Sequence, residues 1–126
     1  MLNKTRWVLL KHIGSPSDPN GCHFDLLLED RSNCRSWRLE QIPNLEGPAL
    51  TLEQISPHNL SWLDTNGKSV SGGRGWASPI ASGYFLGELP AMNGTPFAIE
   101  LCGETLNGRL EIYQNQCVLR SSRVFS

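Results

Sequence analysis

The stretch CHFDLLLED, residues 22–30, says most about the fold of this chain. Successive side chains of a β-strand project to opposite faces, so residues two apart share a face. Three apolar side chains then lie on one face: Phe24, Leu26 and Leu28. His23 and Asp25 lie together on the other. The pattern predicts a strand over 23–29 that separates a hydrophobic core from a polar pair.

The same alternation recurs in short segments along the chain, and no stretch has the i, i+3, i+4 apolar spacing of a long helix. Clusters of Gly, Pro, Asn and Asp bound each segment. The predicted strands cover residues 6–12, 23–29, 36–42, 49–55, 83–88, 97–102, 109–113 and 116–120, with turn-rich loops at 14–22 and 67–75. We therefore expect an all-β protein, a single compact antiparallel β-barrel of about eight strands.

The length of 126 residues suits one domain, spanning 1–126. The formal charge of −1 excludes a global positive field, so any contact with nucleic acid must be local. The N-terminal residues lack the features of a signal peptide, and no apolar run could span a bilayer. We expect a soluble, cytoplasmic monomer that does not contact membranes.

The four cysteines form no CxxC pair, which argues against a zinc knuckle. We expect reduced thiols, with a disulfide between Cys102 and Cys117 across a hairpin as the alternative. Among the aromatic residues, Trp7 and Trp37 lie on predicted strands and are expected in the core.

Two predicted strands bring chemically active side chains close together. His12 ends the first strand, and the loop over 14–22 returns the chain to His23, so neighbouring strands can place both imidazoles beside Asp25. Such a group can bind a divalent metal, or the carboxylate can orient an imidazole as a general base. The alternative is a solvated strand face without function.

The order WVLLKH, CHFDLLLED, RSWRL and PHNLSWLD resembles the 3′-phosphoesterase domain of bacterial DNA ligase D. The segment LCGETLNGRLEIYQNQCVLR is similar to the closing strands of that family, and the resemblance spans residues 12–120. It implies a β-barrel with a metal site, usually manganese, that removes 3′-phosphates or terminal ribonucleotides from nucleic-acid ends. It assigns His12, His23 and Asp25 as metal ligands and His58 to the phosphate side.

The chain also departs from the pattern of that family. Leu27 stands where the family has an arginine, and Trp62 replaces a tyrosine. In an ungapped alignment, Gln41 and Leu50 replace basic residues. Because an arginine binds phosphate through charge-assisted bonds that leucine cannot replace, another cation must act or the substrate differs.

Four residues are therefore candidates for the substrate side of the site. Arg38 and Arg74 could supply the missing cation, the latter in a glycine-rich loop whose backbone N–H groups can approach an anion. His58 would contact the phosphate or transfer a proton, and Trp62 could stack on a base or sugar. The ligand set accepts Mn, which the resemblance favours, or Zn.

Three functions remain open on the sequence alone. The first is a metal-dependent phosphoesterase acting on a nucleic-acid 3′ end or another phosphate ester, with a repair ligase as a possible partner. The second, suggested by Leu27 and the charge balance, is a non-catalytic module that binds nucleic acid or protein. The third is a structural domain whose polar cluster is only solvated.

Overall fold

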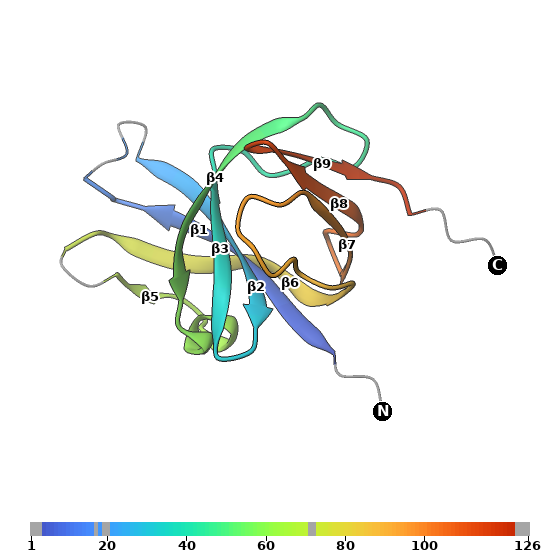
Figure 1. Cartoon of the computed structure of the whole chain (residues 1–126). Helices are drawn as coiled ribbons and strands as arrows, with labels where there is room; N and C mark the ends of the chain where they lie inside the picture. Colours follow the sequence, from blue (N-terminus) through green and yellow to red (C-terminus); the bar gives the residue numbers. More distant parts are fainter. Residues whose placement is uncertain (1–3, 17, 19–20, 71–72, 123–126) are drawn as a thin grey trace.

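The structure, a computed structural model, describes residues 4–16, 18, 21–70 and 73–122. Parts of both predicted loops, residues 17, 19–20 and 71–72, lie outside the described residues. The strands are β1 (Thr5–Ile13), β2 (Cys22–Asp30), β3 (Asn33–Leu39), β4 (Leu50–His58), β5 (Lys68–Ser69), β6 (Trp76–Leu86), β7 (Phe97–Gly103), β8 (Gly108–Tyr113) and β9 (Gln116–Arg120). A short 3₁₀ helix, η1 (Leu60–Asp64), follows β4 (Figure 1).

Eight of these strands close into an antiparallel barrel. The hydrogen-bonded order is β1-β2-β3-β4-β9-β8-β7-β6, and pairing between β1 and β6 completes the circle. The ninth strand, β5, extends the sheet from one end of β6. The predicted all-β barrel is confirmed, and the described residues contain no α-helix.

The barrel interior is filled by one face of each strand. Trp7 and Trp37 are both almost completely buried there, as predicted, and the indole N–H of Trp7 donates to the carbonyl of Tyr84 at 2.9 Å. Leu26 and Leu28 of β2 point to the same interior. Alternation along β2 then sends His23, Asp25 and Leu27 to the outer face of the wall.

A second, smaller apolar cluster covers this outer face. Its buried members are Val8, Leu10, Leu27, Cys34 and Ala77. Leu60, Trp62 and Leu63 of η1 and Val70 pack against it, so the segment after β4 lies over the outside of β1 and β2. We call these nine residues the outer cluster. The polar residues of the site lie next to this cluster on the same outer face of β1 and β2.

Three predicted strands had wrong boundaries. β3 covers Asn33–Leu39 and not residues 36–42. In the other two, β6 and β4, proline is the reason. β6 begins at Trp76 and not at residue 83, because Pro79 lies at the bulge where the register of β1 and β6 shifts, and a bulge tolerates a missing N–H. β4 runs to His58 through Pro57, beside another register shift. The correction to β4 matters for function, since it places His58 on the barrel wall.

The predicted C-terminal hairpin is present. The C-terminal hairpin of β8 and β9 turns at Gln114 and Asn115, both with positive φ. All four cysteines are described and are free thiols, so the alternative Cys102–Cys117 disulfide is absent. Among the described residues, no helix has the length and apolar character needed to cross a bilayer.

Candidate metal centre and phosphate pocket

The predicted metal ligands converge on the outer face of β1 and β2. His12 and His23 are direct partners in the antiparallel register, and their ring centroids lie 4.5 Å apart. Asp25 Oδ2 lies 3.7 Å from His12 Nδ1, and Asp25 Oδ1 lies 3.5 Å from His23 Nε2. All three residues are buried, and one ligand atom from each lies within 4.8 Å of the others. We call this group the His-His-Asp cluster.

Each imidazole has its other nitrogen fixed by an oxygen. His12 Nε2 donates to the carbonyl of Arg74 at 2.5 Å, and His23 Nδ1 donates to Asp18 Oδ2 at 3.1 Å. In this arrangement His12 Nδ1 and His23 Nε2 are the ring nitrogens directed at Asp25. Metal-binding histidines usually have such an outer hydrogen bond, which orients the ring and raises the basicity of the ligand nitrogen.

Three polar atoms at this position are buried without a hydrogen-bond partner among the described residues: His23 Nε2, Asp25 Oδ1 and Arg38 Nε. A buried polar atom left unpaired costs roughly 1–3 kcal/mol. Two of the three belong to the His-His-Asp cluster and lie close enough to share one cation. Two imidazole nitrogens and a carboxylate oxygen form a donor set that fits Mn or Zn, with coordination positions left for water or substrate.

His58 lies at the end of β4, where it pairs with Cys34 of β3. Ser36 Oγ donates to the carbonyl of Cys34 at 2.9 Å and accepts from His58 Nδ1 at 2.8 Å, which fixes the ring. Burial lowers the pKa of His58, and the negative charge of Asp25 opposes this only in part. His58 is therefore a neutral base near pH 7.

The predicted substrate side and the His-His-Asp cluster share one cavity of about 530 Å³. Six of the predicted site residues line it: His12, Asp25, Arg38, His58, Trp62 and Arg74. The seventh, His23, completes the wall through its contact with Asp25. The structure thus brings together every site residue that the sequence predicted.

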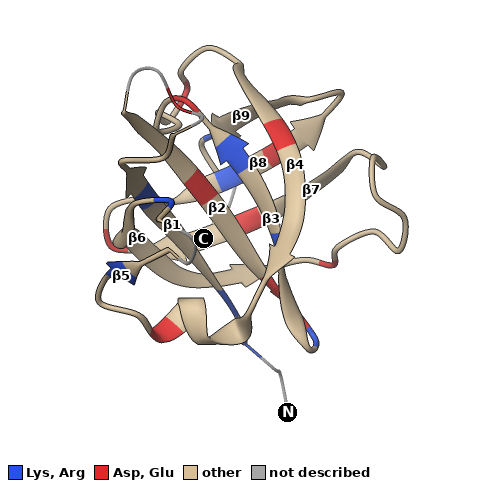
Figure 2. Cartoon of the chain, turned by 90° about the vertical axis from the view of Figure 1, so that its left-hand side faces the viewer, with Lys and Arg blue, Asp and Glu red and all other residues tan. Residues whose placement is uncertain are grey.

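Arg38 lies directly opposite Asp25 in the register of β2 and β3, and its Nε is 3.9 Å from Asp25 Oδ1. Glu53 of β4 is the next residue in this row. Figure 2 shows the row as a basic position on β3 between acidic positions on β2 and β4. Arg74 is exposed at the rim, and its carbonyl contacts the cluster.

Three of the four residues that depart from the ligase D pattern, Leu27, Gln41 and Leu50, do not line the cavity. Leu27 is completely buried in the outer cluster, and Leu50 packs against the barrel interior. Gln41 is exposed in the segment after β3. Trp62 does line the cavity, but the ammonium of Lys68 lies 4.1 Å from its ring centroid, so a cation already covers the indole.

Sequence reasoning missed two supporting residues, Asp18 and Ser36. Asp18 belongs to the loop between β1 and β2, where no strand periodicity predicts the direction of a side chain. Ser36 alternates with the core residue Trp37, so its outward direction could have been predicted, but its bond to His58 depends on the unexpected length of β4.

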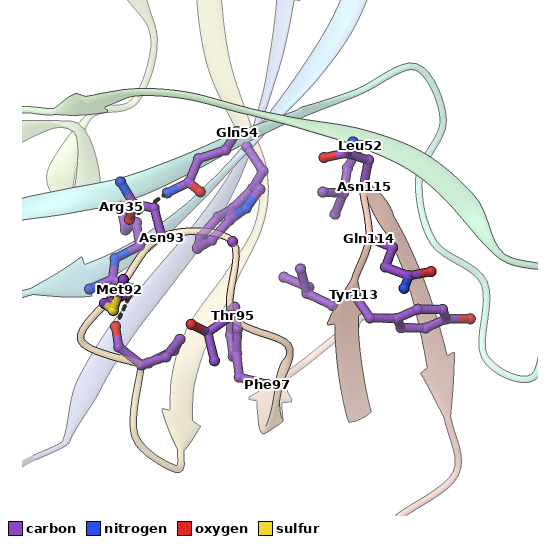
Figure 3. Close-up of a pocket in the computed structure, with 14 residues that line it drawn as sticks. Arg35, Leu52, Gln54, Met92, Asn93, Thr95, Phe97, Tyr113, Gln114 and Asn115 are labelled. Carbon is purple, nitrogen blue, oxygen red and sulfur yellow. Dashed lines mark hydrogen bonds between the residues drawn. The ribbon is translucent and has the colours of Figure 1, made fainter.

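A different pocket, at the end of the barrel under the loop before β7, has polar lining but no comparable cluster (Figure 3). Arg35 there donates to Asp30 and to the carbonyl of Pro90, and Gln54 donates to Asn93. Its volume is only about 70 Å³. With these side chains already paired, this pocket offers less chemistry than the one beside His12.

Comparison with models of protein families and with curated proteins found no match to this chain. The resemblance to the ligase D phosphoesterase domain therefore rests on the sequence motifs quoted above.

Proposed function

We propose that this chain is a divalent-metal-dependent phosphoesterase that removes a terminal phosphate from the 3′ end of a nucleic acid. One observation carries the proposal. Buried, unpaired ligand atoms of the His-His-Asp cluster face one another at the wall of a cavity that also contains a neutral histidine and two arginines. A solvated strand face without function would expose these polar atoms to water.

His12 Nδ1, His23 Nε2 and a carboxylate oxygen of Asp25 would hold the cation. When bound, the cation would polarise a phosphoryl oxygen and make a coordinated water more acidic. The bonds to the Arg74 carbonyl and to Asp18 hold both rings in the orientation that this role needs. These bonds also explain why two imidazoles can lie side by side in a buried position.

His58 would transfer the proton during hydrolysis of the phosphate ester. In hydrolysis, a water oxygen bonds to phosphorus, the ester P–O bond breaks, and the leaving 3′-oxygen gains the proton that the water loses. Because burial keeps His58 neutral, it can accept a proton and return it within one reaction cycle. The Ser36 bond holds Nδ1 and leaves Nε2 as the nitrogen that would exchange the proton.

Contact with nucleic acid would be local, in keeping with the formal charge of −1. Arg38 and Arg74 are the cations that line the cavity among the described residues. A terminal phosphate needs only such a confined positive site, whereas a long duplex contact needs an extended basic surface. The proposed reaction would take place in the cytoplasm.

The test is release of phosphate from a 3′-phosphorylated DNA primer with Mn²⁺. Wild type should yield inorganic phosphate and a primer with a 3′-hydroxyl, and His23→Ala and Asp25→Asn should not. Glu88→Gln is the matched control, since Glu88 is exposed after β6 and does not line the cavity. Wild-type protein that holds Mn²⁺ and releases no phosphate would count against the proposal.

The burial of Leu27 favours a second candidate, a non-catalytic module that binds phosphate-bearing ends without turnover. The two functions separate in the same assay. A module would bind the phosphorylated primer and leave it intact, whereas the phosphoesterase would convert it.

A further inference from the structure

The guanidinium of Arg38 has hydrogen-bonding capacity that the described residues do not use. Its Nε is buried and has no hydrogen-bond partner among the described residues, although 38% of the side chain is exposed. The neighbouring carboxylate of Asp25 is 3.9 Å away, which is too far for a hydrogen bond. The guanidinium therefore lies beside the His-His-Asp cluster with donor capacity left over.

Other cations near the cavity differ from Arg38 in this respect. The ammonium of Lys68 lies over the ring of Trp62. Arg6 binds Asp64 at 2.6 Å and lies 3.8 Å from Glu29. Arg74 is exposed at the rim, and its backbone carbonyl accepts from His12. Arg38 alone, among the described cations, lies opposite a member of the cluster in the strand register and within 4.0 Å of it.

The charges around Arg38 indicate that a ligand bound in the cavity is an anion. Asp25 carries one negative charge, and a divalent cation held by the cluster would more than neutralise it. Arg38 would then stand between this excess of positive charge and the exposed carboxylate of Glu53 on β4, and an anion between Arg38 and the cluster would reduce the repulsion. A phosphate group provides several oxygens, so one can face the cluster while others accept from the planar guanidinium.

We infer that Arg38 binds the substrate phosphate from β3 and supplies the cationic contact that Leu27 cannot make from β2. The inference rests on the proposed function and names the phosphate-binding side chain for it. Leu27 and Arg38 lie on the same outer face of adjacent strands, but Leu27 is enclosed by the outer cluster and Arg38 opens to the cavity. The ligand class is a terminal phosphate, either inorganic or as a monoester.

The experiment measures binding of inorganic phosphate and methyl phosphate by calorimetry, with and without Mn²⁺. Arg38→Ala should weaken phosphate binding by roughly tenfold or more, the effect of losing a charge-assisted hydrogen bond. Arg38→Lys, which keeps the charge and loses the planar fork, should fall between wild type and Arg38→Ala. The control is Arg109→Ala, because Arg109 pairs with Glu111 on another surface.

Metal binding separates the two proposals. Arg38→Ala should bind Mn²⁺ at least as tightly as wild type, since a neighbouring positive charge has been removed. Phosphate binding by Arg38→Ala within twofold of wild type, or no phosphate binding by wild type, would overturn the assignment of Arg38. If wild type binds no metal but binds phosphate through Arg38, the assignment survives and the metal-dependent function fails. Arg38→Gln replaces Arg38→Ala if thermal melting shows that the alanine variant is unfolded.

Discussion

Leu27 gives the sharpest prediction, because the ligase D family has an arginine at this position. Restoring it by Leu27→Arg should destabilise the protein and should not improve phosphate binding. Leu27 is completely buried, against Val8, Leu10 and Cys34 of the outer cluster. Loss of a buried leucine costs roughly 2–5 kcal/mol, and an uncompensated buried charge adds several more.

The expected total of roughly 5 kcal/mol or more approaches the whole stability of a typical domain. Urea denaturation followed by tryptophan fluorescence measures it. Leu86→Arg is the matched control, since Leu86 is 59% exposed on β6 and should change the free energy of unfolding by about 0.5 kcal/mol or less. Leu27→Met should cost less than about 1.5 kcal/mol. A Leu27→Arg protein that is as stable as wild type and binds phosphate more tightly would refute this account of the pocket.

Three further predictions concern titration, thiols and the sheet. Burial lowers the pKa of His58 below 6.5, so the unfolded chain binds this proton more readily, and the free energy of unfolding should fall as the pH drops below about 6.5. The fall should be smaller in His58→Gln when urea melts at pH 7.5 and 5.5 are compared, which lie roughly one unit on either side of the ordinary histidine pKa of the unfolded chain; equal falls would contradict it. Burial raises the pKa of Cys34 and of Cys117 to about 11. A thiol reagent at neutral pH should therefore label the exposed Cys102 and should not label Cys34 or Cys117 until urea is added. Rapid labelling of all thiols in the native protein would be inconsistent with the fold. Gly83→Ala should lower the midpoint of thermal unfolding strongly, because the new Cβ would lie 2.0 Å from the carbonyl of Cys102; an unchanged midpoint would argue against the β6–β7 pairing.

Much of the barrel could be predicted from periodicity because a strand with one face in a core must alternate. Strand boundaries were mispredicted where a local residue signal, such as a proline, is overridden by pairing with a neighbouring strand. Pro79 and Pro57 indicate strand ends, yet both lie at or near register shifts where a missing N–H is tolerated. β5 has only two residues, too few for any alternation.

The His-His-Asp cluster was predictable because strand geometry alone determines it. His23 and Asp25 are two residues apart on one strand, and a short connection brings His12 opposite His23. The supporting bonds were not predictable, because Asp18 and the carbonyl of Arg74 come from loops whose backbone path no periodicity describes. The isolation of Leu27 from the cavity likewise depends on η1, which gives no clear sequence signal.

Metal binding tests the central claim most directly. Titration with Mn²⁺, followed by calorimetry and thermal melting, should show about one site per chain and a rise in the melting midpoint, because a ligand that binds only the native state stabilises it. His12→Ala, His23→Ala and Asp25→Asn should each lose the site, and Glu88→Gln should keep it. Wild-type protein that binds neither Mn²⁺ nor Zn²⁺, or variants of these three residues that bind as wild type does, would contradict the account.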